Sequence, residues 1–266
     1  MTWSTAITAA PRLFVDSPLS EGVEIAASAA HTHYLGTVLR LGPGEPVRLF
    51  NGVDGEWLAA ANAPAALGSG RRAARQGMTL TVRQRTRPQT AENGPWLIFA
   101  LLKRDATDLV IRQAVELGVS KILPVATERT NTARVNEDRL RAIALEAAEQ
   151  SERLTIPVIQ APQRLESLLA AWPPGRRLFA AFERIAANPP PRLLLPLAAR
   201  SSSLGEAALL VGPEGGFTPA EREMLRRLPF VAPISLGPFV LRAETAAAAG
   251  LALLRAMGWA EYVGST

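Results

Sequence analysis

The chain has 266 residues, of which 48% are hydrophobic and 20% are charged, and its formal net charge at pH 7 is +5. This composition is ordinary for a globular protein of one or two domains. The absence of cysteine excludes disulfides, thiolate metal sites and cysteine nucleophiles, and with only His31 and His33 as histidines we expect no metal site.

No apolar run reaches the roughly 20 residues that span a bilayer. The N-terminal stretch also lacks a basic segment followed by a long apolar core, so it does not resemble a signal peptide. We therefore expect a cytoplasmic protein without a membrane partner.

The first 85 or so residues predict a small β-barrel. Short runs of strand length, PRLFVD, PVRLF, EWLAAA and MTLTVRQRT, are separated by turn sequences. One of these turns, NGVDG, predicts a hairpin. The stretch EIAASAAHTHYLGTVLR is the single helical interruption.

A block without acidic residues runs from Ala59 to Ala91 and contains six arginines. The block fits a polyanion-binding surface, and it fits a solvated loop and strand edge equally well. Charge alone leaves both interpretations open. The stretch TRPQTAENG, residues 86–94, has the composition of a linker and predicts a domain boundary.

After this boundary, strands and helices alternate. PWLIFALLK predicts a buried strand and DATDLVIRQAVELG a helix, with Asp105 as its N-cap and Gly118 at its end. KILPVAT predicts the next strand, and Asn136 is the predicted N-cap of the helix after it. The stretches PVIQAP, RLESLLAAW and RRLFAAF continue the pattern. The alternation indicates a parallel α/β sheet with crossover helices.

Two glycine-centred turns, LLVGPEGGF and SLGPFVLRAET, each follow an apolar strand in the last third of the chain. In an open α/β sheet, ligands bind outside the carboxyl ends of the strands, and glycine lets the backbone approach a ligand closely. The Walker A and GxGxxG fingerprints are absent, and GSGRRA follows no convincing strand. Either turn alone fits an ordinary connection, but together they favour a site. After the first turn, Thr218 and Glu221 predict a helix capping box.

At these two turns the sequence resembles the ribosomal RNA small-subunit methyltransferase E family, within the SPOUT class of methyltransferases. Three further stretches, HYLGTVLRLGPGEPVRLFNG, KRDATDLVIRQAVELGVSKILPVATERT and EAAEQSERLTIPVI, extend the resemblance over nearly the whole chain. It implies an α/β protein with a PUA-like β-barrel in residues 1–86 that contacts RNA. It also implies a SPOUT α/β domain in residues 92–266 with a deep trefoil knot, and a homodimer.

The activity implied by the resemblance is methyl transfer from S-adenosylmethionine to N3 of a uridine in 16S ribosomal RNA, on the assembled small subunit. Donor binding is carried over to seven positions: Phe182, Leu210, Gly212, Gly216, Leu236, Gly237 and Leu241. A SPOUT methyltransferase acting on another RNA position and a non-catalytic RNA-binding protein are the alternatives.

Methylation of uracil N3 requires loss of the N–H proton, which leaves negative charge on O2 and O4. A cation near these oxygens would stabilise the anion, and we expect Arg242 in this role. Glu214 and Glu244 are candidate general bases, or they orient Arg242 and the loop. For Glu244, bracing the last helix is an equally good interpretation. The candidate RNA contacts are Arg12, His33, Arg40, Arg71, Arg72, Arg83 and Arg85 in the barrel, with Arg129 and Arg134 in the α/β domain.

Overall fold

The computed structural model describes residues 9–62, 77–130, 135–182 and 206–263. The chain forms two compact units. The first contains Met1–Ala91 together with Ala148–Thr155, and the second contains Glu92–Ala147 and Ile156–Thr266. The segment Ala148–Thr155 therefore groups with the first unit although it lies far beyond the linker in sequence.

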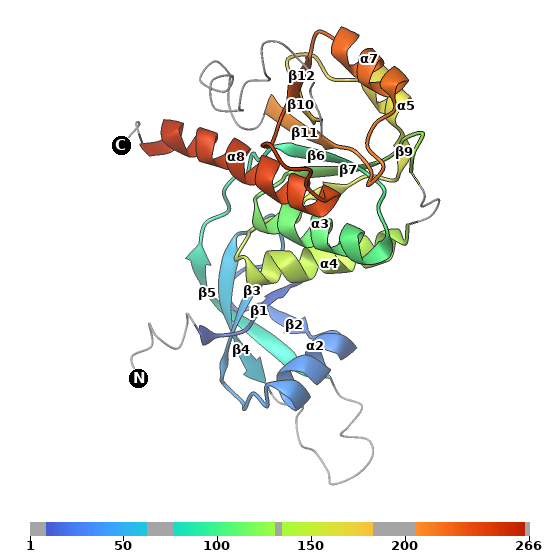
Figure 1. Ribbon diagram of the computed structural model, residues 1–266. Helices are drawn as coiled ribbons and strands as arrows, with labels where there is room; N and C mark the ends of the chain where they lie inside the picture. Colours follow the sequence, from blue (N-terminus) through green and yellow to red (C-terminus); the bar gives the residue numbers. More distant parts are fainter. Residues whose placement is uncertain (1–8, 63–76, 131–134, 183–205, 264–266) are drawn as a thin grey trace. The chain divides into compact units, whose positions relative to one another are not determined.

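The first unit is built on a five-stranded sheet in the order β1-β3-β4-β5-β2, curled into a half-barrel (Figure 1). All neighbouring strands are antiparallel except β1 and β3. Its strands are β1 (Arg12–Phe14), β2 (Glu24–Ala26), β3 (Pro46–Phe50), β4 (Glu56–Asn62) and β5 (Thr79–Arg87). Alternate apolar residues turn inward to form the core, as the strand period of two requires.

The predicted NGVDG hairpin is present between β3 and β4. Gly52 and Gly55 both have positive φ angles, of 82° and 84°. The Asp54 carboxylate accepts hydrogen bonds from the Leu19 backbone N–H at 2.9 Å and from the Asn51 side chain at 2.7 Å. The helical interruption is also present, but it is short: α2 (Ala29–His33) continues directly into one π-helical turn, η1 (Tyr34–Val38).

The second unit contains a parallel sheet in the order β12-β10-β11-β6-β7-β8, with β9 also paired to β7. Every pair in this sheet is parallel, which confirms the predicted architecture. Its strands are β6 (Trp96–Ala100), β7 (Lys121–Ala126), β8 (Val158–Ile159), β9 (Gln163–Arg164), β10 (Arg177–Ala181), β11 (Ala207–Val211) and β12 (Val231–Ile234). The helices are α3 (Arg104–Glu116), α4 (Glu137–Gln150), α5 (Leu165–Ala170), α7 (Pro219–Arg227) and α8 (Ala243–Val263).

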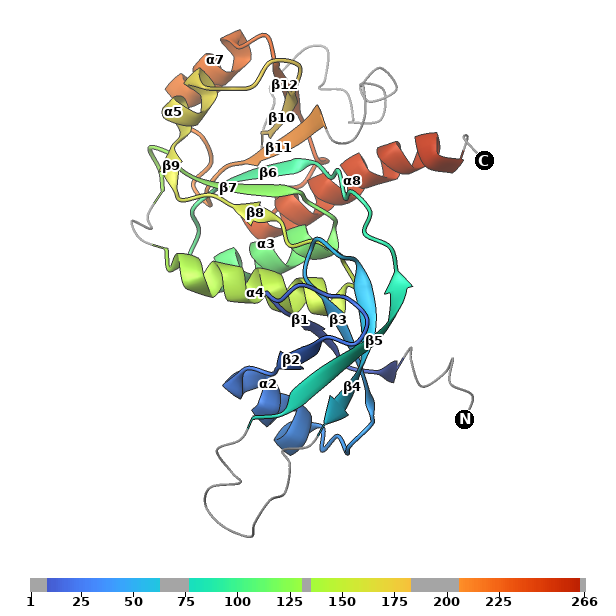
Figure 2. The ribbon, with the colours of Figure 1, turned by 180° about the vertical axis from the view of Figure 1, so that it is seen from behind.

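Helices cover both faces of this sheet. Figures 1 and 2 show α3 and α8 on one face and α5 and α7 on the other. The side chains of β11 point alternately to these two faces. Ala208 and Leu210 belong to the core cluster that contains the leucines of α5 and α7. Leu209 lies on the other face, where it contacts α8 at Gly250. A strand that is covered on both faces must be apolar throughout, which explains why β11, with the sequence AALLV, contains no polar residue.

Helix α3 begins two residues earlier than the sequence predicted. Its N-cap is Lys103, which makes no side-chain capping bond, and Asp105 lies in the first turn. The prediction of Asp105 as N-cap was therefore wrong, although a carboxylate in the first turn still interacts favourably with the helix dipole. The predicted end is confirmed: Gly118 has a φ of 75° and its N–H donates to the Val115 carbonyl.

Candidate active site at the carboxyl edge of the parallel sheet

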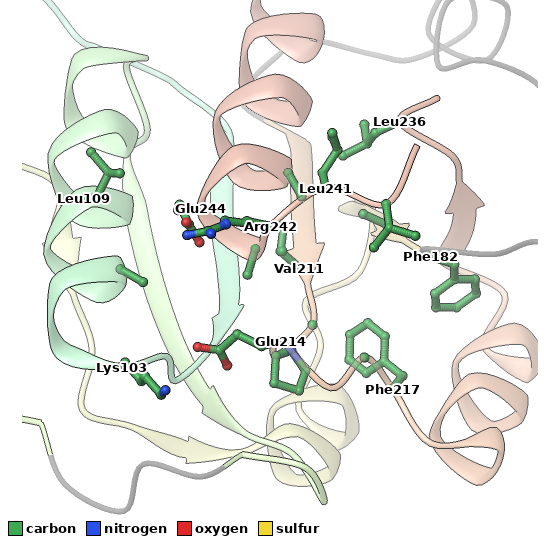
Figure 3. A pocket seen from close by; sticks show the side chains of 18 of the residues that line it. Lys103, Leu109, Phe182, Val211, Glu214, Phe217, Leu236, Leu241, Arg242 and Glu244 are labelled. Carbon is green, nitrogen blue, oxygen red and sulfur yellow. The ribbon is translucent and has the colours of Figure 1, made fainter. Parts of the chain in front are cut away.

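The second unit contains a cavity of about 960 Å³ at the carboxyl ends of its central strands. Strand β10 leads to Phe182, β11 to Gly212 and β12 to Leu236, and all three residues line the cavity. Strand β6 leads, through two buried leucines, to Lys103 in the wall of the same cavity. The two glycine turns therefore line one cavity, which agrees with their predicted position at the strand ends (Figure 3).

The first glycine turn is tight, and the Phe217 side chain leaves no room for a residue larger than glycine at position 212. The Gly216 N–H donates to the Pro213 carbonyl at 2.8 Å, and Gly216 has a φ of 65°. The Phe217 ring folds back so closely that a Cβ on Gly212 would lie 2.9 Å from it. Phe217 also packs edge to face against Phe182, with the ring centroids 5.9 Å apart.

Hydrogen bonds from two neighbouring segments hold this turn. The predicted capping box is present, with the Thr218 N–H donating to Glu221 Oε2 at 2.8 Å and the Glu221 N–H donating to Thr218 Oγ1 at 3.2 Å. The second oxygen of the buried Glu221 carboxylate accepts from the Glu128 backbone N–H at 2.9 Å. Arg129 donates to the Gly215 carbonyl at 2.8 Å. The loop after β7 thus fixes one wall of the cavity.

The second turn leads into α8, whose first turns are rich in small residues. Gly237 has a φ of 128°, and its N–H and carbonyl both contact the Ser235 hydroxyl. In α8, a Cβ on Gly250 would lie 2.7 Å from Leu209, so the absence of a side chain lets the helix approach β11 closely.

Charged side chains gather on one side of the cavity. Figure 3 shows Glu214 between Lys103 and Arg242, with Phe182 and Phe217 on the opposite side. Within the described part of the chain, the side chains of Lys103, Glu214, Arg242 and Glu244 make no hydrogen bond or ion pair. Their charges are therefore free to interact with a ligand.

The structure brings nearly all the expected catalytic and donor-binding residues to this cavity. All three candidate catalytic residues line it: Glu214, Arg242 and Glu244. So do six of the seven expected donor-binding residues: Phe182, Gly212, Gly216, Leu236, Gly237 and Leu241. Leu210 differs, because it is fully buried in the core and its neighbour Val211 lines the cavity instead.

The sequence did not indicate that the N-cap and first two turns of α3 contribute to the cavity, to which they supply Lys103, Arg104, Asp105 and Leu109. The signal was available, because Lys103 follows a buried strand in the same way as the two glycine turns do. Sequence reasoning also missed Phe239 and Val240 in the second turn, whose side chains are 80% and 56% exposed.

The candidate RNA contacts have different environments. Arg83 and Arg85 are exposed on β5, and His33 and Arg40 are exposed near η1. Arg129 is exposed too, but its guanidinium is engaged by Gly215. Three further candidates lie outside the described residues: Arg71, Arg72 and Arg134.

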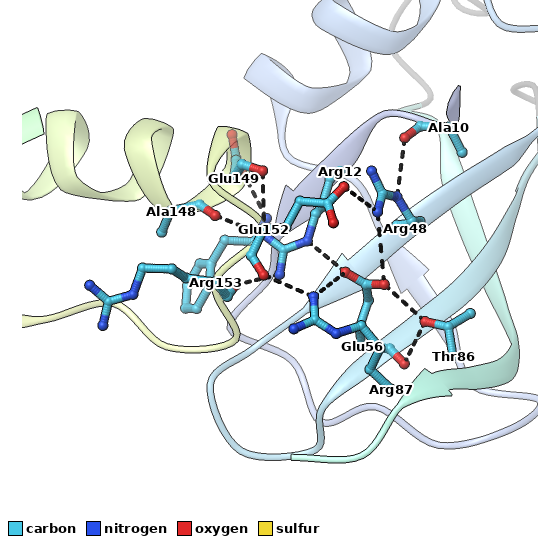
Figure 4. A network of polar contacts seen from close by, with 11 residues as sticks. Ala10, Arg12, Arg48, Glu56, Thr86, Arg87, Ala148, Glu149, Glu152 and Arg153 are labelled. Atoms are coloured by element: carbon cyan, nitrogen blue, oxygen red, sulfur yellow. Dashed lines mark hydrogen bonds and ion pairs between the residues drawn. The ribbon is translucent and has the colours of Figure 1, made fainter. Parts of the chain in front are cut away.

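Arg12 is the exception, because it is buried at 7% exposure within the first unit (Figure 4). Its Nε donates to Glu56 at 2.7 Å, and its other nitrogens donate to the carbonyls of Ala148 and Arg153. The Phe50 ring lies 3.7 Å from the guanidinium carbon, and burial lowers the pKa of Arg12 below its ordinary value. These contacts give Arg12 a structural role and keep it from the surface.

The described residues contain no group of three or more His, Asp or Glu side chains that could hold a metal ion. Among the described helices, none is long and apolar enough to cross a membrane.

Comparison with known proteins gives a consistent result. A family model described as an RNA methyltransferase domain matches residues 92–255, and one described as an RNA methyltransferase PUA domain matches residues 30–60. Ribosomal RNA small subunit methyltransferase E of Rickettsia conorii is 35% identical over 248 residues, which cover 93% of this chain and 96% of the relative. The protein of the same name from Synechocystis sp. is 30% identical over 256 residues, covering 96% of this chain and 80% of the relative.

Among solved structures, a ribosomal RNA small subunit methyltransferase E from Neisseria gonorrhoeae bound to S-adenosyl methionine superposes with a TM-score of 0.77 at 25% identity. The match covers 93% of this chain and 98% of that one. The extent of these matches, together with the cavity formed by the two glycine turns, shows that the chain belongs to the ribosomal RNA small subunit methyltransferase E family.

Proposed function

We propose that this protein transfers a methyl group from S-adenosylmethionine to N3 of a uridine in 16S ribosomal RNA, of the uracil-1498 type. The observation that carries the proposal is the single cavity in which both glycine turns meet Glu214, Arg242 and Glu244. The relative from Neisseria gonorrhoeae, bound to S-adenosyl methionine, supports the choice of donor.

The cavity wall suits this donor. Gly237 has open space where a side chain would stand, which leaves its backbone groups accessible and favours hydrogen bonding to an adenine edge. Phe182, Leu236 and Leu241 supply an apolar surface for the rest of the base and the thioether chain. When bound, S-adenosylmethionine supplies an electrophilic methyl group on a positively charged sulfur.

The chemistry required of the protein is removal of the uracil N3 proton. In this proposal Arg242 donates to O2 or O4 as negative charge develops there, which lowers the pKa of the bound base. A carboxylate of the cavity, Glu214 or Glu244, accepts the proton. Glu244 lies in the first turn of α8, where a negative charge is also favoured by the helix dipole.

RNA binding is assigned to the first unit as well as to the cavity. The exposed Arg83 and Arg85 on β5, with Arg40, are the proposed phosphate contacts of the PUA-like unit. The proposed substrate is the ribosomal small subunit, so the proposal also implies a cytoplasmic location. We further propose that the protein works as a homodimer, which the exposure of Phe239 and Val240 favours.

Transfer of labelled methyl groups to small subunits that lack the modification tests the proposed chemistry. We expect the wild type to label the RNA and Arg242→Ala to lose at least about 100-fold in single-turnover rate, as is typical when a preorganised donor is removed. Calorimetry should find unchanged donor affinity in the same variant.

Arg227→Ala is the matched control, because Arg227 is exposed on α7 and, among the described residues, pairs only with Glu223 at 3.0 Å. It should transfer methyl groups at the wild-type rate. Near-full transfer by Arg242→Ala with unchanged donor affinity would remove Arg242 from the chemistry.

A further inference from the structure

The edge of the cavity formed by the start of α3 carries two cations that the proposed chemistry does not use. Lys103 and Arg104 both line the cavity and both are exposed to solvent. In the described part of the chain, the Lys103 ammonium has no hydrogen bond or ion pair. Arg104 interacts electrostatically with Asp108 on the next turn of the helix.

This edge lies apart from the apolar donor wall. In Figure 3, Lys103 is on the side of the cavity opposite Phe182 and Phe217, and Glu214 lies between Lys103 and Arg242. The volume of about 960 Å³ is at the upper end of the range of about 300–1,000 Å³ for small-molecule sites, so it has room for a nucleotide beside the donor.

A nucleotide within RNA carries its formal negative charge on the phosphates, while its base is neutral until N3 loses a proton. A base positioned at Arg242 therefore brings phosphate groups to the cavity rim. The ammonium of a lysine is a point charge on a flexible side chain, and such a group binds phosphate well. We infer that Lys103, assisted by Arg104, binds the backbone phosphate of the target nucleotide, which makes Lys103 a positioning residue for methyl transfer. The inference rests on the proposed function of the same cavity.

The alternative anionic ligand for Lys103 is the carboxylate of the methyl donor, which lies at the end of its methionine part. The two assignments make different predictions. A residue that binds the donor carboxylate changes donor affinity, whereas a residue that binds phosphate changes RNA affinity and its dependence on salt, since each phosphate contact releases counterions.

The experiment compares Lys103→Ala and Lys103→Arg with the wild type, using small subunits that lack the modification. Lys121→Ala is the matched control: Lys121 is the only other lysine, and it lies at the amino end of β7 with its ammonium 4.3 Å from the Trp96 ring centroid. The readouts are donor affinity by calorimetry, and kcat and KM for the subunits between 50 and 200 mM KCl at constant magnesium.

For Lys103→Ala we expect a KM for small subunits raised about ten-fold and a slope of log KM against log salt reduced by about one. Donor affinity should stay as in the wild type. Lys103→Arg should restore most of the slope because it keeps the charge, and Lys121→Ala should leave every readout unchanged.

An unchanged KM and salt slope in Lys103→Ala would overturn the inference, and so would a ten-fold loss of donor affinity with an unchanged slope. In either case the proposed function stands if the wild type methylates its substrate. A wild type that transfers no methyl group to the small subunit would instead overturn the proposed function, and the inference with it.

Discussion

Position 212 has no room for any residue other than glycine, and a steric contact explains why. A methyl group at this position would meet the Phe217 ring at 2.9 Å, which real Cβ contacts do not reach. Phe217 in turn packs against Phe182, so a displaced Phe217 ring would disturb the proposed donor-binding wall. Overpacking of this kind costs about 1–3 kcal/mol.

We therefore expect Gly212→Ala to bind S-adenosylmethionine at least about five-fold more weakly, which corresponds to the lower end of that cost. Isothermal titration calorimetry measures the change. Gly42→Ala is the control, because its new Cβ would meet only the Glu45 carboxylate at an ordinary distance of 3.8 Å. Equal affinity in both variants would show that the Phe217 contact does not shape the donor site.

Asp54, in the hairpin of the first unit, makes the free energy of unfolding depend on pH. Its hydrogen bonds from the Leu19 N–H and the Asn51 side chain lower its pKa below the usual value of about 3.8. A carboxylate with a lowered folded pKa stabilises the protein above its unfolded pKa, and this stabilisation is lost as the pH falls through the folded value.

The free energy of unfolding of the wild type should therefore exceed that of Asp54→Asn at pH 6, and the difference should narrow below about pH 3.8. Urea titrations between pH 6 and pH 3 provide the measurement. A difference that stays constant over this range would contradict the assignment of the pKa shift to these hydrogen bonds.

At the scale of elements, one side chain at the start of α7, that of Glu221, both caps the helix and binds a neighbouring loop. Glu221 completes the capping box with Thr218 and also accepts the N–H of Glu128, so it joins the first glycine turn to the loop after β7. The carboxylate is buried, with the residue at 2% exposure, so each lost acceptor leaves a backbone N–H without its partner.

We expect Glu221→Ala to lower the free energy of unfolding by about 1–3 kcal/mol and to weaken donor binding. Glu223→Ala on the same helix is the control, because Glu223 is exposed and its one ion pair in the described part of the chain is with Arg227. Its effect should be within about 0.5 kcal/mol. Denaturant unfolding separates the two, and equal losses would count against the bridging role of Glu221.

The elements that the sequence predicted best are those with a local cause. The NGVDG hairpin, the capping box at Thr218 and the apolar strands of the parallel sheet depend on neighbouring residues, and all are present. The predicted start of α3 was wrong by two residues, because a polar side chain marks several possible caps equally well.

At the scale of the whole molecule, the sequence predicted that the two glycine turns meet at the strand ends, but it could not predict that the start of α3 lines the same cavity. That Lys103 faces Glu214 depends on the order of strands in the sheet, which places β6 beside β11. The burial of Arg12 also depends on a distant segment, since Ala148 and Arg153 lie more than 130 residues away. The deep trefoil knot and the homodimer stay predictions.

The most direct test of the proposed function is the position of the transferred methyl group. Small subunits lacking the modification are incubated with the protein and labelled S-adenosylmethionine, and the RNA is digested and analysed by mass spectrometry. We expect one labelled product, N3-methyluridine, from a single site in 16S ribosomal RNA. A methyl group on a ribose 2′ oxygen, on another base, or on no nucleotide at all would contradict the proposed function.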